Sequence, residues 1–208
     1  RFQTKEIAEV LDLPPIPAHL IKLAQWLQDY YPAPLGIITQ QLLPAGLTKP
    51  SLESAAPETT GSAPDLSALP PLTDDQQRTL QDMSEQNSYI LHGTTGSGKT
   101  RIYVELAARA TADGKSAIVL TPEISLTSQL AHRFREVFGK ERVIVMHSQQ
   151  TPAERQRAWL ACLRATGPLV VIGPRSALFA PVAKPGLIVL DEAHEAAYKQ
   201  EQAPQYQA

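Results

Sequence analysis

Cysteine is nearly absent from this chain of 208 residues, in which Cys162 is the only example. One cysteine excludes both a disulfide framework and a cysteine zinc cluster built within the chain, and a buried helix position is its usual place. Long hydrophobic runs are also missing, since no apolar stretch approaches the ~20 residues of a membrane-spanning helix, and no signal-peptide pattern is present. These absences predict a cytoplasmic protein without a membrane partner.

An excess of either charge is lacking as well. The chain has 19 Lys and Arg against 21 Asp and Glu, which gives a formal net charge of -2. This balance excludes a strongly basic protein whose net charge alone attracts it to nucleic acid, although it is compatible with local basic patches. Composition therefore leaves DNA binding open, and the length allows one substantial domain with a smaller piece.

Composition and apolar spacing divide the chain into three regions. Residues 1–47 carry apolar residues at helical spacing on both sides of a proline-rich interruption, which predicts two short helices. Residues 48–71 are rich in Ser, Thr, Ala and Pro without periodicity, so we expect a flexible, disordered linker there. From residue 72 to residue 208, apolar strands alternate with amphipathic helices. The apolar positions of the two short helices are Ile7, Val10 and Leu11, and then Leu20, Leu23, Ala24 and Leu27.

The alternation in the third region predicts an α/β fold with a parallel sheet and helices on both faces. The carboxyl ends of parallel strands share one edge of such a sheet, and ligands bind beyond that edge. Residues that follow the strands are therefore the first candidates for a functional site. The expected strands are residues 88–91, 117–120, 143–146, 169–172 and 187–190, and the expected helices are residues 99–112, 123–138 and 152–165.

A phosphate-binding loop lies between the first expected strand and the helix that follows it. Residues 93–100 have the G-x-x-x-x-G-K-[ST] spacing, in which backbone amides surround the phosphates of a nucleotide. A strand before the loop and a helix after it are the context that this mechanism requires, so the sequence predicts ATP binding rather than a plain glycine-rich turn. The residues expected around the nucleotide phosphates are Gly93, Thr94, Thr95, Gly96, Ser97, Gly98, Lys99 and Thr100.

Two adjacent carboxylates, Asp191 and Glu192, follow the last expected strand. Phosphoryl transfer needs a carboxylate to hold Mg²⁺, usually through its waters, and another group to orient the attacking water. Asp191 and Glu192 suit these two tasks. Without a phosphate loop they would be interpreted as a solvated strand end with helix-starting acids, but together with the loop they favour a nucleotide site.

Three further segments offer groups for DNA or for the base of the nucleotide. Thr121 and Ser125 follow a strand and open a helix, where hydroxyls and amides can grip a phosphate backbone, although the segment is equally typical of a helix cap. Arg175 offers a guanidinium after another strand, and a solvated surface position is its alternative. Gln76 can pair with an adenine edge, and capping of its helix by Thr73 or the next residue is compatible with that role.

These motifs resemble the superfamily 2 DEAH-box helicases and, among them, the PriA-type primosomal replication-restart helicases, over essentially residues 72–208. Residues 93–100 resemble motif I, residues 121–127 resemble motif Ia, and Asp-Glu-Ala-His at residues 191–194 is the DEAH form of motif II. Generic ATPases do not share this combination. The remaining signatures are Met146-His147-Ser148 with Glu154-Arg155 and Trp159, residues 173–181, and Tyr198-Lys199-Gln200.

The resemblance implies a RecA-like P-loop NTPase lobe that binds ATP with Mg²⁺. By this resemblance, Lys99 would contact the β and γ phosphates, and Gln76 would read adenine. Thr100 and Asp191 would hold Mg²⁺, while Glu192 would orient the attacking water. Together with His194, these motifs would form the catalytic part of an ATP hydrolase.

The resemblance also implies contacts with single-stranded DNA. Thr121, Ser125 and Arg175 would lie along the DNA and position its backbone without reading bases, and His194 would couple the nucleotide site to the DNA path. Residues 1–47 resemble the carboxyl end of a 3′ DNA-end-binding domain, present as a short helical remnant, in which Lys5 would lie near the bound DNA end. Trp26, Tyr30 and Tyr31 in this segment are interpreted as packing residues rather than base-stacking platforms.

Two features depart from the family pattern. The family usually inserts a winged-helix domain where this chain has only residues 48–71, so fork recognition by such a module is not implied. Pro174 stands where the family commonly has threonine, which removes a hydroxyl and an amide donor beside the expected DNA path.

The resemblance further implies a longer parent protein, an ATP-dependent helicase that assembles the primosome at stalled forks. We expect a second motor lobe with zinc-binding cysteines beyond residue 208, no zinc within these residues, and no DNA-stimulated turnover by residues 1–208 alone. Single-stranded and forked DNA, primosome proteins and single-strand-binding proteins are the implied partners. A nucleotide-responsive DNA-binding or scaffold module, or another superfamily 2 DNA translocase, is the alternative, but the full set of hydrolytic residues favours the enzyme.

Overall fold

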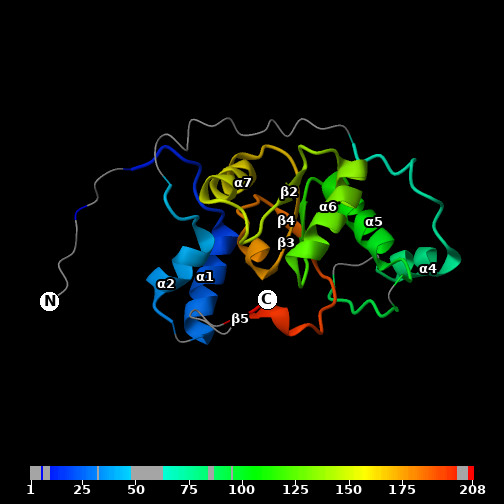
Figure 1. Ribbon diagram of the computed structural model, residues 1–208, viewed down its shortest axis with the longest axis horizontal. Helices are drawn as coiled ribbons and strands as arrows, with labels where there is room; N and C mark the ends of the chain where they lie inside the picture. The colour runs from blue at the N-terminus through cyan, green and yellow to red at the C-terminus, as the bar shows by residue number, and fades with distance from the viewer. Residues whose placement is uncertain are drawn as a thin grey trace.

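The computed structural model describes Glu6 and residues 10–31, 33–47, 63–83, 87–94, 96–200 and 206–208. Its centre is a four-stranded parallel sheet in the order β2-β3-β1-β4, with helices on both faces (Figure 1). The expected α/β class with a parallel sheet is therefore confirmed. The central elements are α5 (Lys99–Ala112), β1 (Ser116–Leu120), α6 (Ile124–Phe138), β2 (Val143–Val145), α7 (Pro152–Arg164), β3 (Val170–Gly173), the 3-10 turn η1 (Arg175–Phe179) and β4 (Pro185–Leu190).

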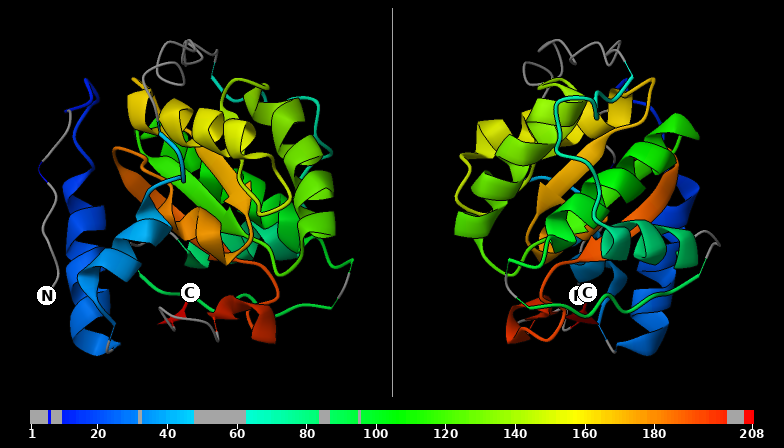
Figure 2. Two further views of the ribbon diagram at one scale, coloured as in Figure 1. Left: turned by 60° about the vertical axis from the view of Figure 1, so that its left-hand side comes forward. Right: turned by 90° about the vertical axis from the view of Figure 1, so that its right-hand side faces the viewer.

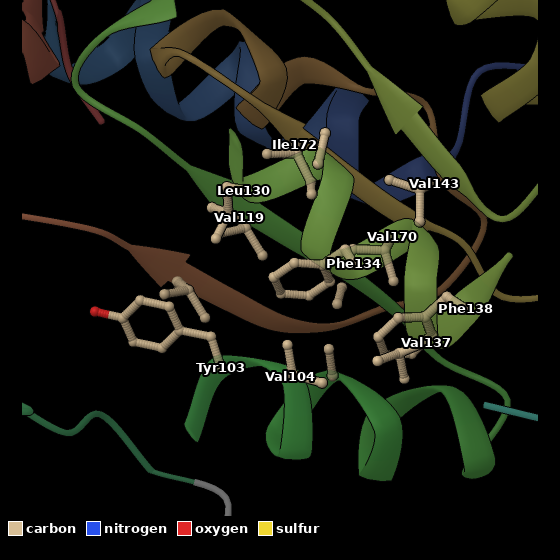
Figure 3. Close-up of a cluster of buried hydrophobic side chains, with 14 of the residues drawn as sticks. Tyr103, Val104, Val119, Leu130, Phe134, Val137, Phe138, Val143, Val170 and Ile172 are labelled. Atoms are coloured by element: carbon tan, nitrogen blue, oxygen red, sulfur yellow. The ribbon is translucent and has the colours of Figure 1, made fainter. Parts of the chain in front are cut away.

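Strand β1 lies inside the sheet, and its side chains alternate between two separate cores. Ala117 and Val119 pack on one face with side chains of α5 and α6, in the cluster shown in Figure 3. Ile118 and Leu120 pack on the other face with Cys162 of α7 and with η1. Every residue of β1 is buried, as expected for a parallel strand that is covered on both faces.

The helices that cover the sheet have clear local signals. Helix α7 begins with a capping box, in which the Thr151 hydroxyl accepts from the Glu154 N–H at 3.3 Å and the Glu154 carboxylate accepts from the Thr151 N–H at 2.8 Å. Cys162 on this helix is 1% exposed, which confirms its expected buried position, and burial raises the pKa of its thiol to about 12. Within the described ranges, no helix is both long and apolar enough to cross a membrane.

Two helices near the N-terminus, α1 (Ala18–Tyr30) and α2 (Leu35–Leu42), pack beside the sheet (Figure 2). The prediction of an earlier helix is wrong for its described residues, because Val10 and Leu11 lie outside any helix and Val10 is 85% exposed. Prolines soon follow these residues, and a helix this short does not offset the cost of nucleation. Ile7 lies outside the described residues.

The two N-terminal helices contact the sheet domain through buried apolar side chains and a hydrogen bond. Leu27 of α1 and Ile38 of α2 are buried in one cluster with Phe179 of η1. Trp159 of α7 donates its indole N–H to the carbonyl of Leu42 at 2.7 Å. Residues 1–47 therefore do not stand apart from the lobe in their described part.

The aromatic residues at the end of α1 pack on one another outside the core. Trp26 is 50% exposed and Tyr30 is 64% exposed, and their rings stack with centroids 5.0 Å apart. Helical spacing places both on the outer face of α1, where each ring also contacts Tyr31 edge to face. Tyr31 is partly buried, and its hydroxyl accepts from the backbone N–H of Gln207 at 3.4 Å.

Residues 63–71, which were expected to belong to a flexible linker, pack on the sheet domain. Leu66 and Leu69 contact the core formed by α5 and α6, and the backbone N–H of Asp65 donates to a carbonyl of α6 at 2.9 Å. The linker prediction is wrong here, because two apolar side chains find a partner that composition cannot reveal. Residues 48–62 of the expected linker lie outside the described residues.

The strand expected before the phosphate loop does not form, because residues 88–91 belong to no strand of the structure. Leu91 packs against the core of α5 and α6, whereas Ile90 is 96% exposed. Strand β4 ends the sheet order among the described residues, and its Ile188 is 48% exposed. The apolar residues of this segment do not share one buried face, so the apolar pattern alone overpredicted this element.

Candidate nucleotide-binding site

The phosphate loop leads directly into α5, whose first residue is Lys99. Gly96 and Gly98 have φ angles of 81° and 88°, in the left-handed region that favours glycine. The Ser97 N–H donates to the carbonyl of Thr94 at 3.1 Å, which closes a tight turn. Thr95 lies outside the described residues. The loop therefore presents backbone at a helix N-terminus, which is the arrangement that binds phosphate groups.

Lys99 connects the phosphate loop with the end of β4. Its Nζ donates to the carbonyl of Gly93 at 2.7 Å and to that of Thr94 at 3.4 Å. The same Nζ lies 3.5 Å from Oε1 of Glu192, and the Lys99 side chain is only 15% exposed. The structure thus brings together a lysine and a carboxylate that lie far apart in the sequence. Thr100, the next residue of α5, is partly buried beside it.

Asp191 follows β4 at the carboxyl edge of the sheet, where its backbone N–H donates to the carbonyl of Leu120 at 2.9 Å. Its Oδ1 accepts from the hydroxyl of Tyr103 at 3.1 Å. Burial raises the pKa of Asp191, and the neighbouring Glu192 carboxylate adds to the rise, against the Tyr103 hydrogen bond and Lys99. A cation beside Asp191 would lower this pKa, because an opposite charge favours the ionised carboxylate.

Glu192 has a φ of 49°, the only positive φ among the described residues other than glycine. Such backbone conformations are strained and are often found at functional sites. Here the turn directs the Glu192 carboxylate to Lys99, while its Oε2 lies 3.8 Å from Nδ1 of His194. His194 is 74% exposed and also lies 3.7 Å from the carboxylate of Glu195. Asp191, Glu192 and His194 are thus grouped beside the phosphate loop.

Gln76 takes part in the expected helix cap, while its contact with adenine stays a prediction. It lies in helix α4 (Asp74–Asp82), where its Oε1 accepts from the Thr73 N–H at 3.0 Å and completes a capping box with that residue. Its Nε2 donates to the carbonyl of Gly98 at 3.4 Å. The cap therefore holds the Gln76 amide against the phosphate loop.

Two of the predicted DNA-contacting residues, Thr121 and Ser125, differ in exposure. Thr121 is 1% exposed, and its hydroxyl lies 2.6 Å from the hydroxyl of Thr127 and donates to the carbonyl of Glu123 at 3.1 Å. The prediction that the Thr121 side chain grips DNA is wrong, because the hydroxyl is buried and paired within the turn. Ser125 is exposed, and its hydroxyl donates to the carboxylate of Glu123 at 3.1 Å.

Arg175 is partly buried and is hydrogen-bonded within the protein. Its Nη1 donates to the carbonyls of Ala197 at 3.0 Å and Lys199 at 2.7 Å, so it ties η1 to the segment that follows the DEAH residues. Lys5, the remaining predicted DNA contact, lies outside the described residues.

Two tyrosines at the site were not predicted as functional. The Tyr103 hydroxyl donates to Asp191, as described above, and the Tyr198 hydroxyl donates toward the backbone carbonyls of Asp191 and Leu120. A signal for Tyr103 was present, because it lies four residues after Lys99 on the same helix face. Tyr198 opens the Tyr198-Lys199-Gln200 signature, but its contacts depend on tertiary packing and could not be read from that motif.

Comparison with known proteins decides the family. Residues 73–208 match the family model described as DEAD/DEAH box helicase, and residues 1–44 match that of a 3′ DNA-binding domain. The chain belongs to the DEAD/DEAH box helicase family. A domain of this family implies ATP and Mg²⁺ in general, and the second model supports DNA binding.

The chain is similar to several bacterial proteins named replication restart protein PriA. The Bacillus subtilis protein is 46% identical over 144 residues, which cover 66% of this chain and 18% of the relative. The Rickettsia felis protein is 35% identical over 194 residues, which cover 93% of this chain and 29% of the relative. The Treponema pallidum protein is 34% identical over 211 residues, which cover 98% of this chain and 31% of the relative. The expected resemblance to PriA-type helicases is confirmed. The chain spans less than a third of the length of these relatives.

Proposed function

We propose that this chain forms the ATP-binding lobe of a DNA helicase that acts in replication restart. The proposal rests on one observation: the phosphate loop lies beside the end of β4. There, Nζ of Lys99 is 3.5 Å from Oε1 of Glu192, next to Asp191. The helicase family model supports the motor activity, and the names of the relatives support the role in replication restart. The match of residues 1–44 to a 3′ DNA-binding domain supports DNA as the substrate.

The residues of the site fit a nucleotide with Mg²⁺. A Cβ added at Gly98 would lie 2.4 Å from Nε2 of Gln76, and one added at Gly93 would lie 2.6 Å from Oγ of Ser97. These two side chains would have to move, and at Gly98 the φ of 88° would also strain any side chain, so the loop favours glycine at this position. Lys99 supplies a cation, and Asp191 supplies the oxygen ligand that Mg²⁺ prefers. When bound, Mg²⁺ neutralises charge on the phosphate oxygens.

Each residue of the site then has a defined task. Lys99 exchanges its hydrogen bonds to loop carbonyls for phosphate oxygens, and Thr100 and Asp191 hold the metal. Glu192 orients the attacking water, for which its carboxylate must separate from Lys99. Gln76, at the capped end of α4, hydrogen-bonds the adenine edge with its side-chain amide.

On the DNA side, the exposed Ser125 remains a candidate for contact with the DNA backbone. Arg175 acts at least partly within the protein, since it fixes the segment that follows His194. His194 lies between Glu192 and the surface, in a position suited to couple the two ligands. Forked DNA, primosome proteins and single-strand-binding proteins are the proposed partners of the parent protein, and zinc would belong to other parts of that protein.

The proposal is tested by separating nucleotide binding from turnover. Lys99→Ala removes the cation that faces the phosphates and should weaken binding of a fluorescent ATP derivative to this chain by at least about tenfold. Glu192→Gln preserves the loop and should bind this nucleotide with affinity close to that of the wild type. In the full-length parent protein, Glu192→Gln should lower DNA-stimulated phosphate release by roughly two orders of magnitude or more.

Two exposed residues after α6 provide matched controls, since Lys140→Ala and Glu141→Gln remove the same charges away from the site. Both control variants should leave binding and turnover unchanged. Turnover by Glu192→Gln at the wild-type rate would remove this residue from catalysis. Nucleotide binding with no DNA-stimulated turnover by the wild-type parent would favour a nucleotide-responsive DNA-binding module.

A further inference from the structure

Tyr103 joins the hydrophobic core to the candidate metal ligand Asp191. It lies one turn after Lys99 on α5, so one helix face carries both the phosphate-binding lysine and this phenol. Its side chain is 7% exposed and packs in the core between α5, α6 and the sheet. Figure 3 shows its ring at the edge of this cluster, with the hydroxyl oxygen pointing away from the other side chains.

The hydroxyl makes one specific contact, which is the 3.1 Å hydrogen bond to Oδ1 of Asp191. A carboxylate oxygen accepts hydrogen bonds, so the Tyr103 hydroxyl is the donor in this contact. A phenylalanine would fill the same core position without this contact. Packing therefore accounts for the ring of Tyr103 but not for its oxygen.

Asp191 is held at a second point by Tyr198, whose hydroxyl reaches the backbone carbonyl of Asp191. Tyr198 belongs to the core on the opposite face of the sheet. The backbone of Asp191 is thus fixed from one face, and its carboxylate is fixed by Tyr103 from the other. Since a carboxylate at a strand end can otherwise rotate about its side-chain bonds, the Tyr103 contact determines which orientation the carboxylate keeps.

We propose that Tyr103 is a positioning residue for the nucleotide-bound Mg²⁺, because its hydroxyl holds the Asp191 carboxylate in the orientation that receives the metal. The inference rests on the proposed function, in which Asp191 is a metal ligand. Residues that hydrogen-bond a metal ligand typically change metal affinity by about 10- to 100-fold when they are removed. The effect of Tyr103 should therefore appear in the Mg²⁺ dependence of nucleotide binding rather than in nucleotide binding itself.

The experiment compares Tyr103→Phe with the wild-type chain in binding of a fluorescent ATP derivative, first with EDTA and then over a series of Mg²⁺ concentrations. Tyr103→Phe should need about ten times more Mg²⁺ to reach half of the metal-dependent gain in affinity. Its affinity in EDTA should equal that of the wild type. Tyr31→Phe is the matched control, since it also removes one phenolic oxygen but lies in the N-terminal helices, and it should change neither quantity.

A double-mutant cycle with Asp191→Asn shows whether Tyr103 acts through Asp191. In the Asp191→Asn background, loss of the Tyr103 hydroxyl should have no further effect on the Mg²⁺ dependence. An unchanged Mg²⁺ dependence in Tyr103→Phe, an equal loss of affinity with and without Mg²⁺, or a full effect in the Asp191→Asn background would each overturn the inference. Wild-type binding that does not respond to Mg²⁺ would instead contradict the proposed function.

Discussion

The two ends of the molecule's long axis are built in opposite ways (Figure 1). At one end, α1 and α2 meet the sheet domain through buried apolar side chains, and Trp159, which is 3% exposed, donates to Leu42 within this interface. At the other end, the phosphate loop beside α4 presents the exposed residues Gly96 and Ser97. The contact of Gln76 with the loop is a single 3.4 Å hydrogen bond.

This difference shows that the residues that stabilise the fold and the residues that bind the nucleotide are largely separate. The N-terminal interface buries apolar surface, which is the main favourable contribution to folding. The phosphate loop instead leaves backbone amides uncovered for a ligand, and such sites contribute little to stability or even reduce it. Substitutions at the first end should therefore change the free energy of unfolding, and those at the second end should change nucleotide affinity.

The largest effect is expected at the N-terminal interface. Trp159→Ala removes a buried ring and leaves the carbonyl of Leu42 without its donor, so it should lower the free energy of unfolding by about 3–5 kcal/mol. Trp26→Ala, at an exposed position of α1, is the control and should change it by less than about 0.5 kcal/mol. Thermal and urea unfolding followed by circular dichroism measures both variants. Equal stability of the two variants would show that α1 and α2 are not part of the folded unit.

A smaller change in stability, with a large change in binding, is expected at the phosphate loop. Gly98→Ala places a Cβ on a residue with φ of 88° and 2.4 Å from Nε2 of Gln76. We expect a loss of about 1–3 kcal/mol in stability and a loss of most Mg²⁺-nucleotide affinity.

Gly114 provides a control for the backbone effect, since its φ is 71° and no atom lies within 4 Å of an added Cβ. Gly114→Ala should cost a similar strain energy of about 1 kcal/mol and leave nucleotide affinity unchanged. Unfolding curves and titration with a fluorescent ATP derivative measure the two quantities. Retained affinity in Gly98→Ala would contradict the need for bare backbone at this position.

The sequence was informative wherever a local signal and the tertiary structure agree. The apolar residues of α5 pack on the sheet, and those of β1 are buried on both faces of it. The spacing from Gly93 to Thr100 placed the loop at the start of α5, as the structure shows. The position of Asp191 and Glu192 followed from the rule that ligand sites lie at the carboxyl ends of parallel strands. The loop lies beside them through α5, although the strand expected before it does not form. The fold class and the grouping of the phosphate loop with the two carboxylates could therefore be predicted without a structure.

Predictions failed where tertiary contacts decide the outcome. Thr121 follows β1 with its hydroxyl directed inward to Thr127, and the spacing of hydroxyl residues does not reveal which side they face. The hydrogen bonds of Arg175 to backbone carbonyls of a segment more than twenty residues away are indicated by no local pattern, while its contact with DNA stays a prediction. Residues 63–71 have the composition of a linker, yet Leu66 and Leu69 are enough to attach them to the core.

The smallest predicted effect compares the two capping boxes, which have the same chemistry but lie in different regions. Thr73→Ala and Thr151→Ala each remove the hydroxyl that accepts from the third residue of a helix, at 3.3 Å in both cases. Each variant should lose about 1 kcal/mol of stability, and the melting temperature should fall by a similar amount in both. The box at Thr73 also holds Gln76, whose amide contacts the phosphate loop, whereas the box at Thr151 serves only to start α7.

The two variants should therefore differ in nucleotide selectivity although they agree in stability. Thr73→Ala keeps the backbone N–H that donates to Oε1 of Gln76, but it removes the hydroxyl that accepts from the backbone N–H of Gln76. The first turn of α4, which places the Gln76 amide, should therefore loosen, and the preference for an ATP over a GTP derivative should fall by a few-fold, in line with about 1 kcal/mol. Thr151→Ala should retain the wild-type preference. Competition of unlabelled ATP and GTP against a fluorescent nucleotide measures this ratio at a temperature where both variants are folded. A similar loss of preference in both variants would mean that the cap at Thr73 stabilises the helix without positioning Gln76 for the base.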